Sequence, residues 1–189
     1  TYEAELVVGH NGETQVLAGP VAFNVKRLRT GALPSAPLDE IERFNTELDD
    51  LYGQTAAVRY TIRDARQQLD RLTTMLARMS RPLPSGSRRV HAIRAEMFEI
   101  EALVFGVDVQ DDIGGYGPMS VSSWLGHARR GVSNSSYGPT ASHRQSVDHA
   151  RSVFEPVKAQ LNELVDVALP TLKREMQAAG APWTVGQAI

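Results

Sequence analysis

The sequence predicts a mainly α-helical fold: an antiparallel bundle of three long helices and one short helix, preceded by a β hairpin. Two observations carry this prediction. Between residues 41 and 79, apolar residues recur at spacings of three and four, which is the pattern of a helix packed along its whole length. Residues 2–8 and 21–25 instead show a period of two, which is typical of β-strands.

The predicted hairpin occupies residues 1–29 and is the first element of the chain. The Asn11-Gly12 pair tolerates the positive φ angles of a tight turn, and the returning strand is expected to be interrupted at Gly19-Pro20. One face of the first strand carries Tyr2, Ala4, Leu6 and Val8. A lone hairpin is marginally stable in water, and the chain opens inside a strand without Met. We therefore expect the hairpin to pack on the helices or to end a β domain that lies upstream.

Residues 30–37 are predicted to be a proline-rich linker, and the helical domain is predicted to span 38–189. Its first helix should be about 40 residues, or roughly 60 Å, long. Gly53 inside it costs about 1 kcal/mol relative to alanine. The predicted seam consists of Ile41, Phe44, Leu48, Leu51, Thr55, Val58, Ile62, Ala65, Leu69, Leu72, Leu76 and Met79.

The second long helix is expected to start at a Ser87 cap and to end at Gly106. Its core positions are Val90, Ile93, Met97, Ile100 and Val104. Residues 107–118 are rich in Asp, Gly and Pro and are predicted to be a loop, and Ser120 then caps a short helix. Residues 131–138 are predicted to be a second loop.

The last helix is predicted to begin near Thr140, and its apolar seam changes phase near Leu164. Pro156 and Pro170 lie inside the pattern, so we expect a kink or break at one or both. Trp183 is expected to fold back onto the bundle, because an indole buries a large apolar area.

Composition excludes several classes of function. Twenty basic and 22 acidic residues give a net charge of -2, and no long run of like charge marks a nucleic-acid site. No apolar run is long enough to span a membrane. The chain has no cysteine, so disulfides, thiolate zinc sites and cysteine nucleophiles are excluded.

The polar residues form no catalytic or metal-binding motif, and we predict no catalytic residue, no cofactor and no metal. The five histidines form neither His-Glu-x-x-His nor Glu-x-x-His. His143 and His149 are six residues apart, a spacing that puts them on different faces of a helix, so a solvated polar face is the simpler interpretation. Asp108, Asp111 and Asp112 lack the ligand order of a calcium loop.

Four segments of the second half carry a family resemblance: 138–144 (GPTASHR), 154–157 (FEPV), 169–172 (LPTL) and 178–184 (AAGAPWT). They resemble the end of bacterial BNR-repeat, sortilin-like β-propeller proteins that are described as glycosyl hydrolases. In that family a signal peptide and a propeller precede an Ig-like β segment, whose closing strands are similar to residues 2–25, and a helical tail. The resemblance implies a periplasmic or extracellular location and a catalytic site, if the parent protein has one, outside this chain.

Three functions are compatible with this reading. The leading hypothesis is a non-catalytic C-terminal helical module of a secreted propeller protein, which contacts the propeller and Ig-like segment of its own parent chain or binds a protein. The second hypothesis is a domain that completes a carbohydrate-binding or glycosidase site through its loops, with Trp124, Tyr116 and Tyr137 stacking on sugar rings. The third is a homodimeric coiled-coil scaffold, although packing within one chain is the more ordinary use of such a seam.

Overall fold

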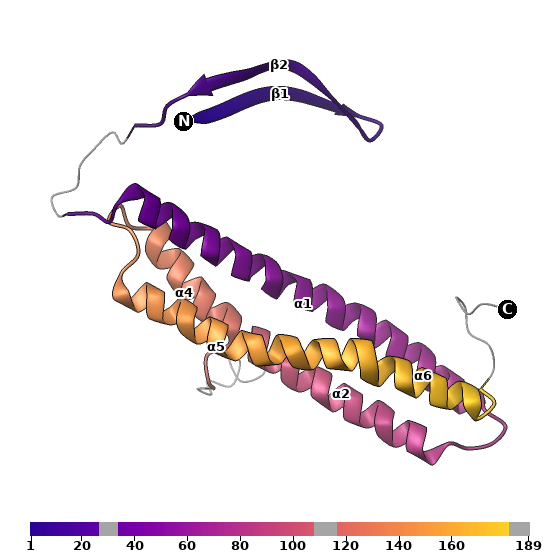
Figure 1. Ribbon diagram of the computed structural model, residues 1–189. Helices are drawn as coiled ribbons and strands as arrows, with labels where there is room; N and C mark the ends of the chain where they lie inside the picture. The colour runs from indigo at the N-terminus through magenta and orange to yellow at the C-terminus, as the bar shows by residue number, and fades with distance from the viewer. Residues whose placement is uncertain (27–33, 108–116, 182–189) are drawn as a thin grey trace. The chain divides into compact units, whose positions relative to one another are not determined.

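The computed structural model describes residues 1–26, 34–107 and 117–181 of the chain. It divides into two compact units, Thr1–Pro34 and Ser35–Ile189. The predicted mainly α-helical fold with an N-terminal hairpin is confirmed (Figure 1).

The first unit is a two-stranded antiparallel hairpin of β1 (Tyr2–His10) and β2 (Glu13–Phe23). The turn is Asn11-Gly12, and both residues have positive φ, 52° and 83°, as the sequence predicts. The expected interruption at Gly19-Pro20 is not a break, because β2 continues through it. The register shifts at this point, because Gly19 and Pro20 of β2 lie opposite Glu5 alone, and it shifts again at Leu17, so the irregularity is absorbed as bulges in β2.

The second unit is a helical bundle built on α1 (Leu38–Arg78). Next come α2 (Pro84–Phe105) and α4 (Val121–Ser133), and then α5 (Ala141–Glu163), a π-helical segment η1 (Leu164–Ala168) and α6 (Leu169–Ala178). Figure 1 shows α5 continuing into α6 along α1.

Cross-helix pairs show how the helices run. Glu40 pairs with Arg144, Glu47 with Arg151 and Gln54 with Lys158, and each pair is separated by 104 residues. Because both members advance together by seven residues, α1 and α5 are parallel and keep one heptad register. On the other side of α1, ion pairs attach α2 to its second half and α4 to its first half: Arg94–Asp70, Arg66–Glu101 and Arg129–Asp49. The bundle therefore has three helical columns. The first is α1, the second is α5 continued by α6, and the third consists of α2 and α4.

The α1 seam forms the centre of the core, as predicted from Phe44 to Leu72. At the last turns the prediction is wrong: Met75 is buried, whereas Leu76 and Met79 are only half-buried. A straight α-helix drifts relative to a seven-residue repeat, which accounts for this change of face. The five core positions predicted for the second long helix are all buried.

Two helix boundaries differ from the predicted ones. The second helix begins at Pro84 rather than after Ser87, because proline fits the first helical turn, where its missing N–H has no partner to lose. The short helix is capped by Ser120 as predicted, but it continues through Gly131 to Ser133, where a loop was expected. The last helix begins after its Thr140 cap, as predicted.

The irregularity predicted for the last helix lies at Pro170 and not at Pro156. Helix α5 runs through Pro156, whereas the π-helical segment immediately precedes α6. In this segment the Leu169 N–H donates to the Leu164 carbonyl. The buried Leu164 and Leu169 are thus five positions apart instead of three or four, and this longer step is the change of phase that the sequence shows.

Candidate functional site

The contact between α4 and α5 contains several of the residues considered above for binding or chemistry. Trp124 on α4 is half-buried, and its ring lies 5.2 Å from that of His149 on α5. His127 on α4 meets His143 on α5 edge to face at 5.8 Å. His149 is exposed, as predicted for a solvated face, whereas His143 is half-buried, and both imidazoles contact α4.

His143 is held in place by the start of its own helix. Its Nδ1 accepts the Thr140 N–H at 3.2 Å, and its own N–H donates to the Thr140 Oγ1 at 3.4 Å, which forms a reciprocal capping box. A Cβ atom on Gly131 would overlap the His143 ring, so α4 needs glycine where it crosses α5. Burial, and then the neighbouring His127, lower the pKa of His143 below its ordinary value of 6.5.

These contacts give His143 a structural role. One ring nitrogen is used in the capping box, and the Nε2 side lies against Gly131. Among the residues that the structure describes, no group of three or more His, Asp or Glu side chains is arranged to hold a metal ion. Asp108, Asp111 and Asp112 lie outside the described residues.

The three aromatic residues proposed to stack on sugars are not seen together. Tyr116 lies outside the described residues, as does Trp183. Tyr137 is 38% exposed in the turn before α5, and its carbonyl accepts the Ala36 N–H at 2.9 Å. Trp124 is half-buried beside the exposed His149. No ring contact joins Trp124 and Tyr137, and with Tyr116 outside the described residues their role in stacking on sugars stays a prediction.

The hairpin provides a different kind of candidate surface. The register pairs Tyr2 with Phe23, Ala4 with Val21 and Leu6 with Ala18, and cross-strand partners share a face of the sheet. The Tyr2 and Phe23 rings stack at 5.9 Å. Tyr2, Leu6, Val21 and Phe23 are 47–64% exposed, so this face is apolar and open to solvent. An apolar face of this kind is typical of a sheet that packs on another surface.

No helix within the described residues is long and apolar enough to cross a membrane. Comparison of the chain with protein-family models, curated proteins and solved structures finds no match.

Proposed function

We propose that this chain is a non-catalytic interaction module, in which the hairpin docks on a β domain and the helical bundle is an accessory domain. The observation that carries the proposal is the apolar hairpin face of Tyr2/Phe23, Ala4/Val21 and Leu6/Ala18, which is exposed. A two-stranded sheet gains little stability alone, so covering this face stabilises the hairpin as well as the contact.

The family resemblance supports a more specific form of the proposal. If residues 2–25 correspond to the closing strands of an Ig-like segment, their apolar face packs on the remaining strands of that segment. The chain is then the C-terminal region of a secreted β-propeller protein, and any glycoside hydrolysis belongs to the propeller.

The bundle interior supports an accessory role for the helices. The a/d residues of α1 are buried by helices of the same chain, so the seam is already used within one molecule. This observation favours the accessory module over a homodimeric scaffold that associates through that seam.

The test is a binding experiment in trans. The probe is the propeller and Ig-like region of a protein from the resembled family, expressed without its helical tail. Hydrogen exchange of the β1 and β2 amides should slow on mixing, and the Phe23→Lys variant should abolish this protection. The matched control is Ala22→Lys, which places the same charge on the opposite face and should leave the protection intact.

Two results would refute the proposal. One is unchanged hydrogen exchange of the hairpin in the presence of the probe. The other is turnover of glycoside or ester substrates by the chain itself. Glycan binding that is lost in Trp124→Ala would support the carbohydrate hypothesis instead.

A further inference from the structure

We propose that the groove between α1 and α6 binds an acidic, amphipathic segment of a partner protein. The proposal concerns a second surface and is independent of the hairpin contact. It rests on the lining of the groove, on the charge at this end of the bundle and on the π-helical segment beside it.

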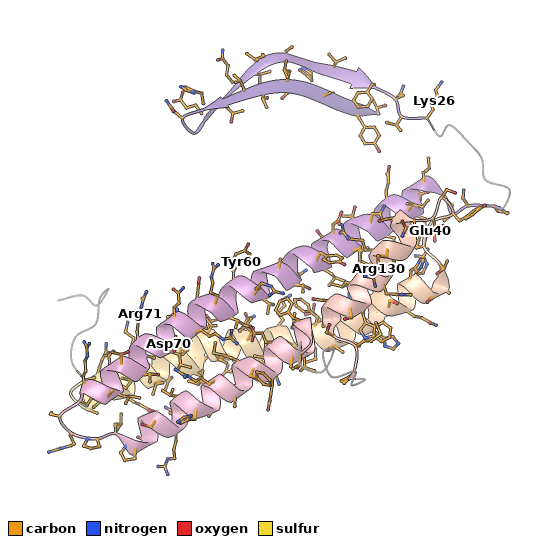
Figure 2. All side chains as sticks on the ribbon, turned by 180° about the vertical axis from the view of Figure 1, so that it is seen from behind. Lys26, Glu40, Tyr60, Asp70, Arg71 and Arg130 are labelled. Carbon is orange, nitrogen blue, oxygen red and sulfur yellow. The ribbon has the colours of Figure 1, made fainter. Side chains whose placement is uncertain are left out.

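The groove has a volume of about 260 Å³, and its two kinds of lining residue fit an amphipathic ligand. Its apolar part is formed by Leu72 and Met75 of α1 and by Leu169 and Pro170 of α6. Arg71 and Lys173, one from each helix, line the same groove and are exposed (Figure 2, where Arg71 is labelled). A ligand with an apolar side chain between two carboxylates would satisfy both parts.

The surrounding end of the bundle carries a large excess of positive charge. Segments 66–94 and 169–178 contain nine arginine or lysine residues and two acidic residues, a net charge of +7, although the whole chain carries -2. The two acidic residues are already paired, Asp70 with Arg94 and Glu175 with Arg89. Among the described residues, no carboxylate lies within ion-pair distance of Arg71, Arg78, Arg81, Arg88 or Lys173. Within the part of the chain that the structure describes, this cluster therefore lacks the anions that would neutralise it.

A second copy of this chain is a poor source of those anions. The most acidic part of the bundle is the start of α1, but three of its six carboxylates already meet arginines from α4 and α5, and Asp39 pairs with Arg43. The pairs are Glu40–Arg144, Glu47–Arg151 and Asp49–Arg129. The start of α1 in a second copy therefore offers few free carboxylates, and we assign the missing negative charge to a different molecule.

The lining of the groove favours a protein over a nucleic acid. Proteins that follow a phosphate backbone combine cations with aromatic side chains on which bases stack, and none of the described residues that line this groove is aromatic. Arginine binds carboxylates through a planar, two-pronged geometry. The groove wall at Leu169 and Pro170 directly follows η1, and π-helical turns inside α-helices occur frequently at functional sites.

The probe for this proposal is a fluorescently labelled amphipathic peptide of about 14 residues, or about four helical turns, with leucine on one face and glutamate on the other. Its binding to the full chain is followed by fluorescence anisotropy. Reversing both groove charges in Arg71→Glu/Lys173→Glu should weaken binding by about tenfold or more. Arg43→Glu/Arg63→Glu makes the same change in net charge on exposed α1 positions outside the groove, and it should weaken binding much less.

The decisive comparison reverses the charges of both the peptide and the groove. A peptide with lysine in place of glutamate should bind the groove variant better than the wild-type chain. Equal binding of the glutamate peptide and its glutamine analogue, or equal losses in both double variants, would overturn the proposal. So would preferential, groove-dependent binding to a DNA duplex or to phosphatidylserine vesicles, or self-association that the groove variant abolishes.

Discussion

The protonation state of His143 affects the stability of the turn between α4 and α5. Its Nδ1 accepts the Thr140 N–H, so the capping box requires the neutral imidazole. Protonation would replace an acceptor by a donor and would place positive charge at the N-terminus of α5, beside His127. Both effects oppose protonation in the folded state, in the same direction as burial.

The pH dependence of stability follows from this lowered pKa. Below 6.5 the unfolded chain protonates at this position before the folded chain does, so stability falls as the pH falls from about 6.5 through the folded-state pKa. Denaturant unfolding at about pH 7.5 and about pH 5 should show a larger loss for the wild type than for His143→Gln, whose amide oxygen retains an acceptor without titrating. His91→Gln, on an exposed face of α2, should behave as the wild type. An equal loss in His143→Gln would exclude His143 as the cause.

Two helical glycines differ in what a methyl group would meet. The Cβ of an alanine at Gly131 would overlap the His143 ring, whereas at Gly53 it would meet no atom within 4 Å. Gly131→Ala should therefore lower the free energy of unfolding by about 1–3 kcal/mol. Gly53→Ala should raise it by up to about 1 kcal/mol, since only helix propensity changes. Thermal and denaturant unfolding measure both effects, and the same sign for both variants would contradict this account.

The sequence predicted the residues of this site better than their roles. Thr140 was identified as a helix start, but His143 is not the glutamate or glutamine that usually completes a capping box, so their reciprocal bond was missed. Gly131 was assigned to a loop because glycine disfavours helices, and only its packing against His143 explains why it lies in one. Both facts depend on side-chain contacts between separate helices, which local patterns do not contain.

At the scale of elements, α1 and α5 are connected by polar pairs that repeat with the heptad. Glu40–Arg144, Glu47–Arg151 and Gln54–Lys158 flank the apolar seam at successive turns of the repeat. The side chains of Glu47 and Arg151 are 41% and 42% exposed, so solvent screens their attraction. Such pairs contribute more to register and direction than to total stability.

Charge exchange at the middle pair tests this role. Arg151→Glu should destabilise the chain by about 0.5–1 kcal/mol, because it places Glu47 opposite a like charge. Adding Glu47→Arg should recover most of the loss, and a double-mutant cycle of denaturant unfolding measures the coupling. Strictly additive losses would show that the pair has no energetic coupling.

Pro156 should lower the stability of the folded chain measurably, because α5 continues through it without a break. It is exposed on α5, and it provides no N–H for the preceding turn. Pro156→Ala should raise the free energy of unfolding by about 1–3 kcal/mol. The exposed neighbour Glu155 provides a control, since Glu155→Ala should change stability by no more than about 0.5 kcal/mol. Destabilisation by Pro156→Ala would show that the proline shapes a contact that the core requires.

Long regular elements were predicted well because each one carries many repeats of its pattern. The α1 seam and the change of phase near Leu164 could be read directly, since a single extra residue moves every later apolar position. The form of the irregularity could not be read, because Pro156 and Pro170 have the same local chemistry but only the second follows a π-helical turn. Likewise, Ser87 is a good cap residue, yet Pro84 begins the helix.

At the scale of the whole molecule, the two units have separate sources of stability. Every residue of the bundle core lies between Phe44 and Met176, and both strands of the hairpin are exposed throughout. The basic end of the bundle is also visible only in the whole molecule. Its cations come from α1, α2, the turn between them and α6, so no run of like charge revealed them in the sequence.

Removal of the hairpin should therefore leave the bundle intact. A chain of residues 35–189 should unfold with a melting temperature within about 2 °C of that of the full chain, because it retains every residue of the bundle core. Thermal unfolding followed by far-UV circular dichroism provides the comparison. A large fall in the melting temperature would show that the hairpin stabilises the helices.

The π-helical turn at Leu164–Ala168 also sets a rule for engineering. It lies between α5 (141–163) and α6 (169–178), whose apolar residues follow heptad repeats in different frames. If the π-helical turn were replaced by regular α-helix of the same length, the residues of α6 would be rotated by about 100° relative to α5. A redesigned helix in place of α5 or α6 must therefore keep this turn, or lose one residue, for its apolar face to meet the core.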